Sequence, residues 1–147
     1  MSIDDPLLGS ASYLLLKAGR YVIAEFDDAL DELTLSHREA LVLSFVSATE
    51  GLSQQELSDR LGLDPTIVVG LVDGLESRGL LKRLRDPDDR RRNKLLLTEH
   101  GVALRQRAIA AISAFENPLL GPLSDSERRQ LQEILHKMMA PRLPWLR

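Results

Sequence analysis

Apolar residues recur every three or four positions between residues 7 and 31, the spacing that places them on one face of an α-helix. One stripe consists of Leu15, Gly19, Val22, Phe26 and Leu30, and a second stripe beside it of Leu14, Ala18 and Tyr21. A helix that is apolar over so much of its circumference needs two partners. We predict that these are the rest of its own domain and a second subunit. The alternative is a helix at the centre of a monomer.

Three Ser-x-x-Glu segments, beginning at Ser36, Ser53 and Ser124, have the pattern of a capping box. In this motif the serine and glutamate side chains bind the free N–H groups of a helix start. The first two predict helices that end before residue 50 and at Gly62. The third predicts a final helix with an apolar side of Leu131, Ile134, Leu135, Met138 and Met139.

Asp64 and Pro65 supply an N-cap and a proline at the first helical position, so a further helix is predicted from there to Arg78, with Gly79 as its stop. Only the turn 62–64 separates it from the preceding short helix, which is the spacing of a helix-turn-helix. Its predicted buried side consists of Ile67, Val68, Leu71, Val72 and Leu75. The positions predicted to face outward are Pro65, Thr66, Val69, Gly70, Asp73 and Gly74.

Two short leucine-containing runs, 80–85 and 94–97, flank the turn-forming residues 86–89 and three consecutive arginines. This pattern predicts a β-hairpin with an arginine-rich loop. Leu52 is placed to add a brief extended contact to it. A helix-turn-helix followed by such a hairpin, or wing, is a winged helix. The predicted fold class is therefore mainly α with a small β-hairpin wing.

The segment after the wing is predicted to be mostly helical. A long helix capped by Thr98 is expected to end at about Asn117, where Pro118 opens a loop. The tail, residues 141–147, is interrupted by prolines and too short for a helix, yet it is apolar. We expect it to fold over the partner subunit and so bury Trp145. The alternative is a frayed end.

Composition narrows the class of protein. The chain has 147 residues, of which 44% are hydrophobic and 28% charged, as expected for one soluble domain. Cysteine is absent, which excludes disulfides, thiolate metal sites and thiol redox sensing. The N-terminus lacks the basic segment of a signal peptide, and charges interrupt its apolar run. We therefore expect neither secretion nor a membrane span, and a cytoplasmic location.

Positive charge is concentrated in the wing. Residues 82–94 contain seven Lys and Arg side chains and three Asp, a local net charge of +4, whereas the whole chain has −3 and the remainder −7. An acidic body with one basic finger focuses the attraction for polyanions in that finger. The alternative is a solvated hairpin with internal Asp–Arg pairs. The preceding helix-turn-helix favours the first interpretation.

The run from Asp64 to Gly101 resembles the signature of the multiple antibiotic resistance regulator (MarR) family of bacterial transcription factors. Three motifs carry the resemblance, namely LVDxLExxGL at 71–80, DRR at 89–91 and LTxxG at 97–101. The resemblance implies a homodimer, built from N- and C-terminal helices, that binds palindromic operators. On this basis the single domain 1–147 contains a DNA-binding lobe, 36–97, and dimerisation helices, 7–31 and 98–147.

The resemblance also implies roles for the wing residues. In a winged helix on DNA, the second helix of the motif lies in the major groove and the wing reaches the minor groove, where a narrow groove attracts arginine. Arg91 is predicted to insert there and Asp89 to fix its direction. Arg90 and Arg92 are predicted to contact phosphates. The alternative is that all three arginines merely solvate a loop.

The groove-facing helix offers fewer contacts. Thr66 can hydrogen-bond or touch a thymine methyl group, Val69 can make only apolar contact, and Gly70 has no side chain. Asp73 is able to accept from cytosine but would repel a phosphate. The start of the preceding helix is expected to contribute hydroxyl, amide and free N–H groups at the DNA backbone, through Ser53, Gln54 and Gln55. Specificity is expected to depend on the wing and on DNA shape.

Many members of the resembled family bind a small aromatic or phenolic anion between the dimer helices and the DNA-binding lobe. Such a ligand shifts the spacing of the two recognition helices. By position, the candidate lining residues are Lys17, Arg20, Tyr21 and His37. The alternative is that each is a surface or helix-end residue.

Metal, cofactor and catalytic motifs are not found. His37, His100 and His136 are far apart in the sequence and lack HxxxH or HExxH spacing, so no metal site is predicted. No cofactor and no enzyme activity are predicted. The predicted function is a homodimeric, ligand-responsive repressor that binds double-stranded DNA at a pseudo-palindromic operator. The alternative is a winged-helix module that grips an acidic protein with its hairpin.

Overall fold

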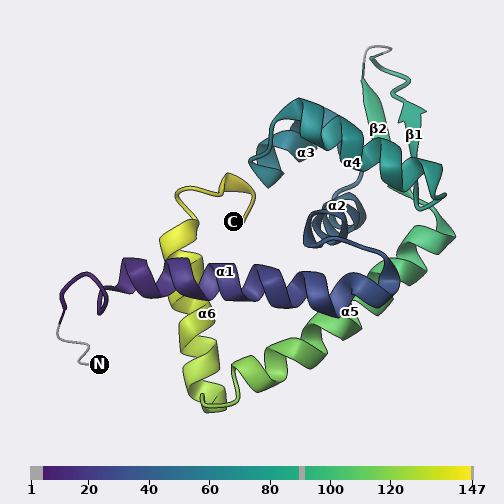
Figure 1. The fold of residues 1–147 in the computed structure, drawn as a ribbon. Helices are drawn as coiled ribbons and strands as arrows, with labels where there is room; N and C mark the ends of the chain where they lie inside the picture. Colours follow the sequence, from purple (N-terminus) through teal and green to yellow (C-terminus); the bar gives the residue numbers. More distant parts are fainter. Residues whose placement is uncertain (1–4, 90–91, 147) are drawn as a thin grey trace.

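The computed structural model describes residues 5–89 and 92–146, and in them shows six α-helices and one antiparallel hairpin (Figure 1). The helices are α1 (Ala11–Leu30), α2 (His37–Ala48), α3 (Gln54–Leu61), α4 (Pro65–Ser77), α5 (Glu99–Leu119) and α6 (Asp125–Met139). The hairpin strands are β1 (Leu81–Arg85) and β2 (Asn93–Leu97), and single 3₁₀ turns lie at Asp31–Leu33 and Pro144–Leu146. The predicted fold class is confirmed. No helix in the described ranges is both long and apolar enough to cross a membrane.

The molecule has two parts (Figure 1). One lobe is formed by α2, α3, α4 and the hairpin, and α5 leads away from the base of the hairpin. α1 packs against both α2 and α5, so it connects the lobe to the C-terminal helices. α6 lies apart from the lobe and, although described in full, has no buried residue.

The helix starts are fixed by local hydrogen bonds, as the Ser-x-x-Glu pattern predicts. In each of the three capping boxes the serine backbone N–H donates to the glutamate carboxylate at 2.8 Å, and the serine hydroxyl accepts from the glutamate N–H. The Ser53 hydroxyl also donates to Glu56 at 2.6 Å and lowers the pKa of that carboxyl. Gly62 and Gly79 follow α3 and α4 with φ of +62° and +68°, which glycine adopts without strain.

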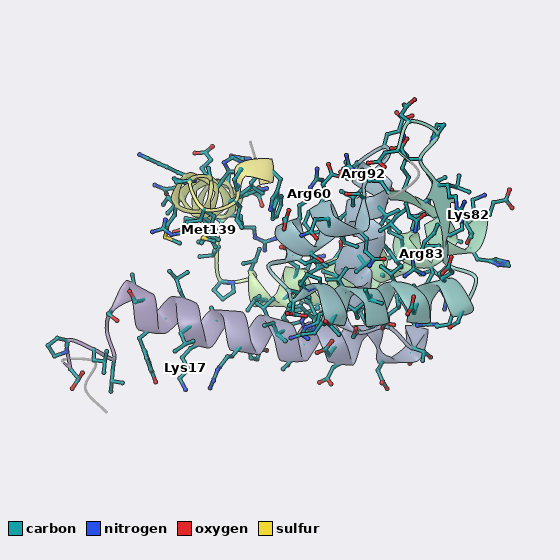
Figure 2. All side chains as sticks on the ribbon, turned by 90° about the horizontal axis from the view of Figure 1, so that it is seen from above. Lys17, Arg60, Lys82, Arg83, Arg92 and Met139 are labelled. Atoms are coloured by element: carbon teal, nitrogen blue, oxygen red, sulfur yellow. The ribbon has the colours of Figure 1, made fainter. Side chains whose placement is uncertain are left out.

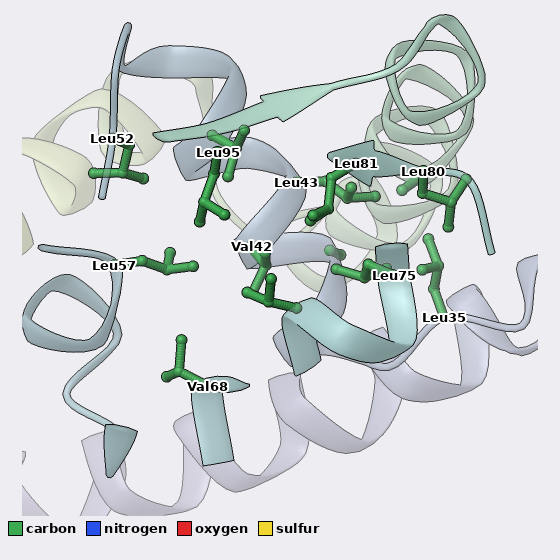
Figure 3. Close-up of a cluster of buried hydrophobic side chains, with 14 of the residues drawn as sticks. Leu35, Val42, Leu43, Leu52, Leu57, Val68, Leu75, Leu80, Leu81 and Leu95 are labelled. Carbon is green, nitrogen blue, oxygen red and sulfur yellow. The ribbon is translucent and has the colours of Figure 1, made fainter. Parts of the chain in front are cut away.

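The hydrophobic core lies in the lobe (Figure 3). Its fully buried side chains come from the helices and both strands, and include Leu43, Leu57, Val68, Leu75, Leu81 and Leu95. On α4, Val68, Val72 and Leu75 are buried as predicted. Ile67, predicted to be buried, is 44% exposed, and Leu71 is only partly buried. The reason is that Ile67 lies about 100° around the helix from Val68, beyond the edge of the core.

The hairpin is extended by the segment that precedes α3. β1 and β2 pair in register along their whole lengths. The Leu52 carbonyl accepts from the Leu95 N–H at 2.9 Å, and Ser53 forms an isolated bridge with Lys94. The contact predicted for Leu52 is therefore confirmed. It joins the start of α3 to the wing.

The end of α5 is predicted wrongly. The sequence predicts an end at Asn117 and a loop from Pro118, whereas α5 continues to Leu119. A proline in the last turn removes only one helical hydrogen bond. The Leu120 N–H still donates to the Glu116 carbonyl at 2.9 Å, so the helix passes through Pro118.

The C-terminal tail forms one 3₁₀ turn, although its prolines predict no helix. Trp145 packs edge-on against Phe45 of α2, with ring centroids 4.8 Å apart. The His136 ring Nε2 lies 2.7 Å from the Leu146 carbonyl oxygen. Trp145 thus packs against its own chain, whereas the sequence predicts that the tail folds over the partner subunit and buries Trp145 there.

Candidate nucleic-acid interface and ligand cleft

α4 presents an outward face beside the hairpin. Thr66, Val69 and Asp73 lie on this face and are exposed, Val69 to 38%. The positions predicted to face outward are all exposed except Gly74, which is half-buried. Gly70 and Gly74 leave gaps, because a Cβ atom built at either would have nothing within 4 Å. The face is therefore narrow and has few side chains that form hydrogen bonds.

Arg83 of β1, labelled in Figure 2, contacts both helices of the motif. Its guanidinium pairs with Asp73 at 2.6 Å and with Glu76, both on α4. From Nε and Nη2 it donates to the side-chain oxygen of Gln54 on α3, at 3.3 and 3.1 Å. The Arg83 side chain is 20% exposed. A single side chain thus contacts α3, α4 and the wing together.

The start of α3 carries Ser53, Gln54 and Gln55. Ser53 is 5% exposed, and its hydroxyl is occupied within the capping box. Gln54 is half-buried and accepts from Arg83, whereas Gln55 is exposed. Of these three side chains, Gln55 and part of Gln54 are presented at the surface.

Arg92 turns from the wing back onto the start of α3. Its Nη2 lies 3.3 Å from the Ser53 hydroxyl and 3.4 Å from the Glu56 carboxylate. The Arg92 side chain is still 50% exposed. Its charge adds to the effect of Ser53 in lowering the pKa of Glu56. Arg92 is thus oriented by α3 while part of its surface remains accessible.

The tip of the wing carries Asp89, which is exposed and whose carbonyl accepts from the Arg92 N–H at 2.9 Å. The predicted positions of Arg90 and Arg91 lie outside the described residues. Nothing in the geometry therefore tests the predicted pairing of Asp89 with Arg91.

β1 adds basic residues that the sequence analysis did not assign to the site. Lys82 and Arg85 are exposed, and in the described part of the chain no carboxylate lies within ion-pair distance of either. Arg85 lies on the same side of the strand as Arg83, because side chains alternate along a strand. That two-residue alternation is the sequence signal that would have placed Arg83 and Arg85 beside the helix-turn-helix.

A separate cleft of about 50 Å³ lies between α1, α2 and α5. Its lining is mainly apolar and consists of Phe26, His37, Ala40, Leu41, Ser44, Arg105, Ala108, Ile109 and Ile112. The Nε atom of Arg105 is buried and has no hydrogen-bond partner within the described chain. A buried guanidinium donor without a partner is unfavourable by itself and is suited to an anion.

His37 is the predicted ligand residue that reaches this cleft. Its backbone N–H donates to Asp27 of α1 at 2.7 Å, and its ring Nδ1 lies 3.0 Å from the same carboxylate. The backbone hydrogen bond is the main cause that lowers the pKa of Asp27. His37 therefore connects the wall of the cleft to α1.

The other predicted ligand residues, Lys17, Arg20 and Tyr21, do not line the cleft within one chain. Lys17 Nζ lies 5.5 Å from the ring centroid of Tyr13, and the Tyr21 ring lies 6.0 Å from that of Phe115. Within residues 5–89 and 92–146, no group of three His, Asp or Glu side chains is placed to hold a metal ion.

Known proteins match this chain along nearly its whole length. A model of the MarR family matches residues 33–92, which span α2, the helix-turn-helix and the wing up to the start of β2. The HTH-type transcriptional repressor Rv2887 of Mycobacterium tuberculosis is 30% identical over 135 residues, which cover 92% of this chain and 95% of that protein. The chain belongs to the MarR family. The resemblance seen in its motifs is confirmed.

Solved structures of MarR-family regulators share the fold. CouR from Rhodococcus jostii RHA1, bound to p-coumaroyl-CoA, has a TM-score of 0.83 and 33% identity over 94% of this chain and 97% of that one. CouR bound to a 23-mer DNA duplex has a TM-score of 0.85 and 29% identity, with the same coverage. Rv2887 in complex with salicylic acid has a TM-score of 0.74 and 28% identity over 93% and 99% of the two chains. This MarR-family protein is a transcriptional regulator.

Proposed function

We propose that this MarR-family protein is a homodimeric repressor that binds double-stranded DNA at a pseudo-palindromic operator. The observation that carries the proposal is the joint presentation of α4 and the wing, which Arg83 holds in one arrangement. In this arrangement α4 enters the major groove and the wing reaches the adjacent minor groove. Because chromosomal DNA is the proposed partner, the protein acts in the cytoplasm.

Dimerisation is supported by apolar faces that one chain leaves uncovered. In α1, which is described in full, Leu30 is the one buried residue, and the side chains exposed by 47% to 57% include Leu14, Leu16, Tyr21 and Ile23. On α6 a second stripe of Leu131, Ile134 and Met138 is 36%, 54% and 38% exposed. A second copy of the chain is the partner that covers such faces symmetrically. Two copies present two α4 helices about 34 Å apart, one turn of DNA.

The wing supplies the positive charge of the proposed complex. Arg91 inserts into the minor groove, Asp89 directs it, and Arg90 contacts a phosphate. Arg92 reaches a phosphate from its position at the start of α3, where half of its side chain is exposed. Arg85 adds a positive charge on the side of β1 that also carries Arg83. These contacts attach the protein to any DNA sequence and set its register.

The cleft between α1, α2 and α5 is the proposed site for an aromatic anion. Its apolar walls suit a ring, and the Arg105 Nε supplies a donor for a carboxylate or phenolate. Salicylic acid, the ligand of Rv2887, is of this kind. An aromatic ring occupies a cavity of roughly 150 Å³, so binding requires α1, α2 and α5 to move apart. That movement would change the separation of the two α4 helices and release DNA.

Selection from random DNA tests the proposal. The full-length protein is equilibrated with random duplexes at about 0.15 M salt, and the bound DNA is sequenced. Two inverted half-sites with centres about 10 base pairs apart are expected. If no sequence is enriched, even at low salt, the repressor proposal is wrong, and the acidic protein partner becomes the better interpretation of the basic wing.

Salicylate is the probe for the cleft. It is expected to release the selected duplex from the wild type, and Arg105→Gln should raise the required concentration by about tenfold, the effect of one charge-assisted hydrogen bond. Arg107→Gln, which alters an exposed arginine of the same helix, is the matched control. The cleft is not the ligand site if both variants respond to salicylate as the wild type does.

A further inference from the structure

The outward face of α4 has few groups that can read a base by hydrogen bonding. Gly70 and Gly74 lie on it, and a Cβ atom at either would have nothing within 4 Å. The Ser77 hydroxyl turns back to its own helix and donates to the Gly74 carbonyl at 2.8 Å. The side chains that remain on this face are Pro65, which has no hydrogen-bonding group, and Thr66, Val69 and Asp73.

Asp73 is already engaged. Its carboxylate accepts from Arg83 at 2.6 Å, and Arg83 is itself held by Glu76 and Gln54. The ion pair fixes the direction of this carboxylate and occupies one of its two oxygens, so Asp73 in this position offers at most the other oxygen to the amino group of a cytosine. The carboxylate of this face therefore connects the helix to the wing and adds at most one hydrogen-bond acceptor to the face.

Val69 and Thr66 supply exposed methyl groups on the surface that meets the bases. Val69 is wholly apolar yet 38% exposed. Thr66 lies one helical turn before it, on the same side of α4, and contributes a methyl group beside its hydroxyl. In the major groove the distinguishing apolar feature is the C5-methyl group of thymine.

We propose that α4 recognises its half-site by packing Val69 and Thr66 against thymine methyl groups. The inference rests on the proposed function, because it names the chemistry that α4 reads in an operator. Burying one methyl group changes affinity by about fourfold. A two-fold symmetric complex makes the contact twice, so the full effect is about fifteenfold.

Uracil substitution isolates this contact, because uracil pairs as thymine does and lacks only the C5-methyl group. The probe is the duplex selected by the full-length protein, with uracil placed at one thymine position in both half-sites together. At the one or two thymines under α4, affinity should fall about fifteenfold. At thymines elsewhere in the duplex it should fall by less than about twofold.

Two variants connect the methyl groups of DNA to those of the protein. Val69→Ala removes the apolar contact, and Thr66→Ser removes a methyl group but keeps the hydroxyl. At the thymine that Val69 faces, Val69→Ala should bind the thymine and uracil duplexes with equal affinity. At the thymine that Thr66 faces, Thr66→Ser should do the same. Ile67→Ala is the matched control, because Ile67 is 44% exposed on the opposite flank of α4. It should keep the wild-type response to uracil.

The inference is overturned if no thymine of the half-site gives more than about a twofold loss, or if the loss persists in both Val69→Ala and Thr66→Ser. Either result leaves the proposed function intact, since selection has by then returned an operator. If selection returns no operator, the proposed function fails and the inference fails with it.

Discussion

At the scale of single residues, Arg83 decides what the interface can do. Its guanidinium meets the carboxylates of Asp73 and Glu76 and the amide oxygen of Gln54. Without it, two negative charges would stand uncompensated next to the DNA backbone. The sequence alone did not reveal this role, because Gln54 lies 29 residues before Arg83. Such a contact depends on how the hairpin folds back onto the helices.

Arg83→Gln is therefore expected to weaken binding of the selected duplex by at least about tenfold, as measured by fluorescence anisotropy. Adding Asp73→Asn should restore part of the affinity, because it removes one of the stranded charges. Lys82→Gln is the control, since Lys82 is an exposed cation of the same strand. If Lys82→Gln and Arg83→Gln reduce the affinity for the duplex by the same factor, and Asp73→Asn restores none of it, Arg83 contributes only its positive charge and does not position the helices.

Glu56 gives a residue-scale prediction about pH. Ser53, through its hydroxyl and its N–H, holds the pKa of the Glu56 carboxyl below its ordinary value. A carboxyl whose pKa is lower in the folded state stabilises the fold above the unfolded pKa, roughly 4.3, and this contribution is lost as pH falls through the folded pKa. In urea unfolding, Glu56→Gln should be less stable than wild type by about 0.5–1 kcal/mol at neutral pH, and this difference should shrink as the pH falls below about 4. The exposed Glu50→Gln should show no such change.

At the scale of elements, the start of α5 is locked against the turn between α4 and β1. The Thr98 hydroxyl donates to the Gly79 carbonyl at 2.6 Å, and the Thr98 N–H donates to the Leu80 carbonyl at 3.1 Å. A Cβ atom at Gly101 would lie 1.9 Å from the Leu80 carbonyl oxygen. The glycine of the LTxxG motif is therefore required by packing, and it fixes the direction in which α5 leaves the lobe.

Gly101→Ala should destabilise the protein by about 1–3 kcal/mol through this clash, although alanine is the better helix former. Gly74→Ala is the matched control in α4, where the added methyl group meets nothing within 4 Å. It should stabilise the protein by about 0.5–1 kcal/mol. Urea unfolding followed by circular dichroism measures both changes. Two changes of the same sign would contradict the packing role.

The elements themselves were largely predictable, because their signals are local. Each capping box lies within four residues of sequence, so Ser36, Ser53 and Ser124 marked three helix starts correctly. Ile67 was assigned to the core wrongly, because a stripe of apolar residues does not show where the core ends. Pro118 was predicted to end the helix because proline usually interrupts one. In the last turn, however, proline removes only one hydrogen bond, which the helix tolerates.

At the scale of the whole molecule, one chain is incomplete. The broad apolar face of α1 predicted an additional partner, and Leu14, Leu15 and Leu16 are indeed left exposed by the rest of the chain, whereas Leu30 is buried. The contact that the tail makes could not be predicted from local sequence, because Trp145 packs against Phe45 of α2, about a hundred residues earlier in the chain. Which aromatic ring it meets depends on how α5 and α6 turn the chain, not on local pattern.

Ile134→Glu tests the proposed dimer. Ile134 is 54% exposed in the middle of the apolar stripe of α6, and a charge there would be buried in the interface. Sedimentation should find a folded monomer with DNA binding reduced by at least about a hundredfold, because one half-site is lost. Gln132→Glu, on a polar position of the same helix, should remain a dimer. A dimeric Ile134→Glu variant would show that α6 is not part of the interface.

The central claim is that this protein distinguishes one DNA sequence from another through α4 and the wing. The direct measurement is an equilibrium titration of the full-length protein with the selected duplex and with a scrambled duplex of equal composition, at several salt concentrations. We predict binding to the selected duplex that is at least about a thousandfold tighter at physiological salt, with both affinities falling steeply as salt rises. Equal affinity for the two duplexes at every salt concentration would contradict the claim.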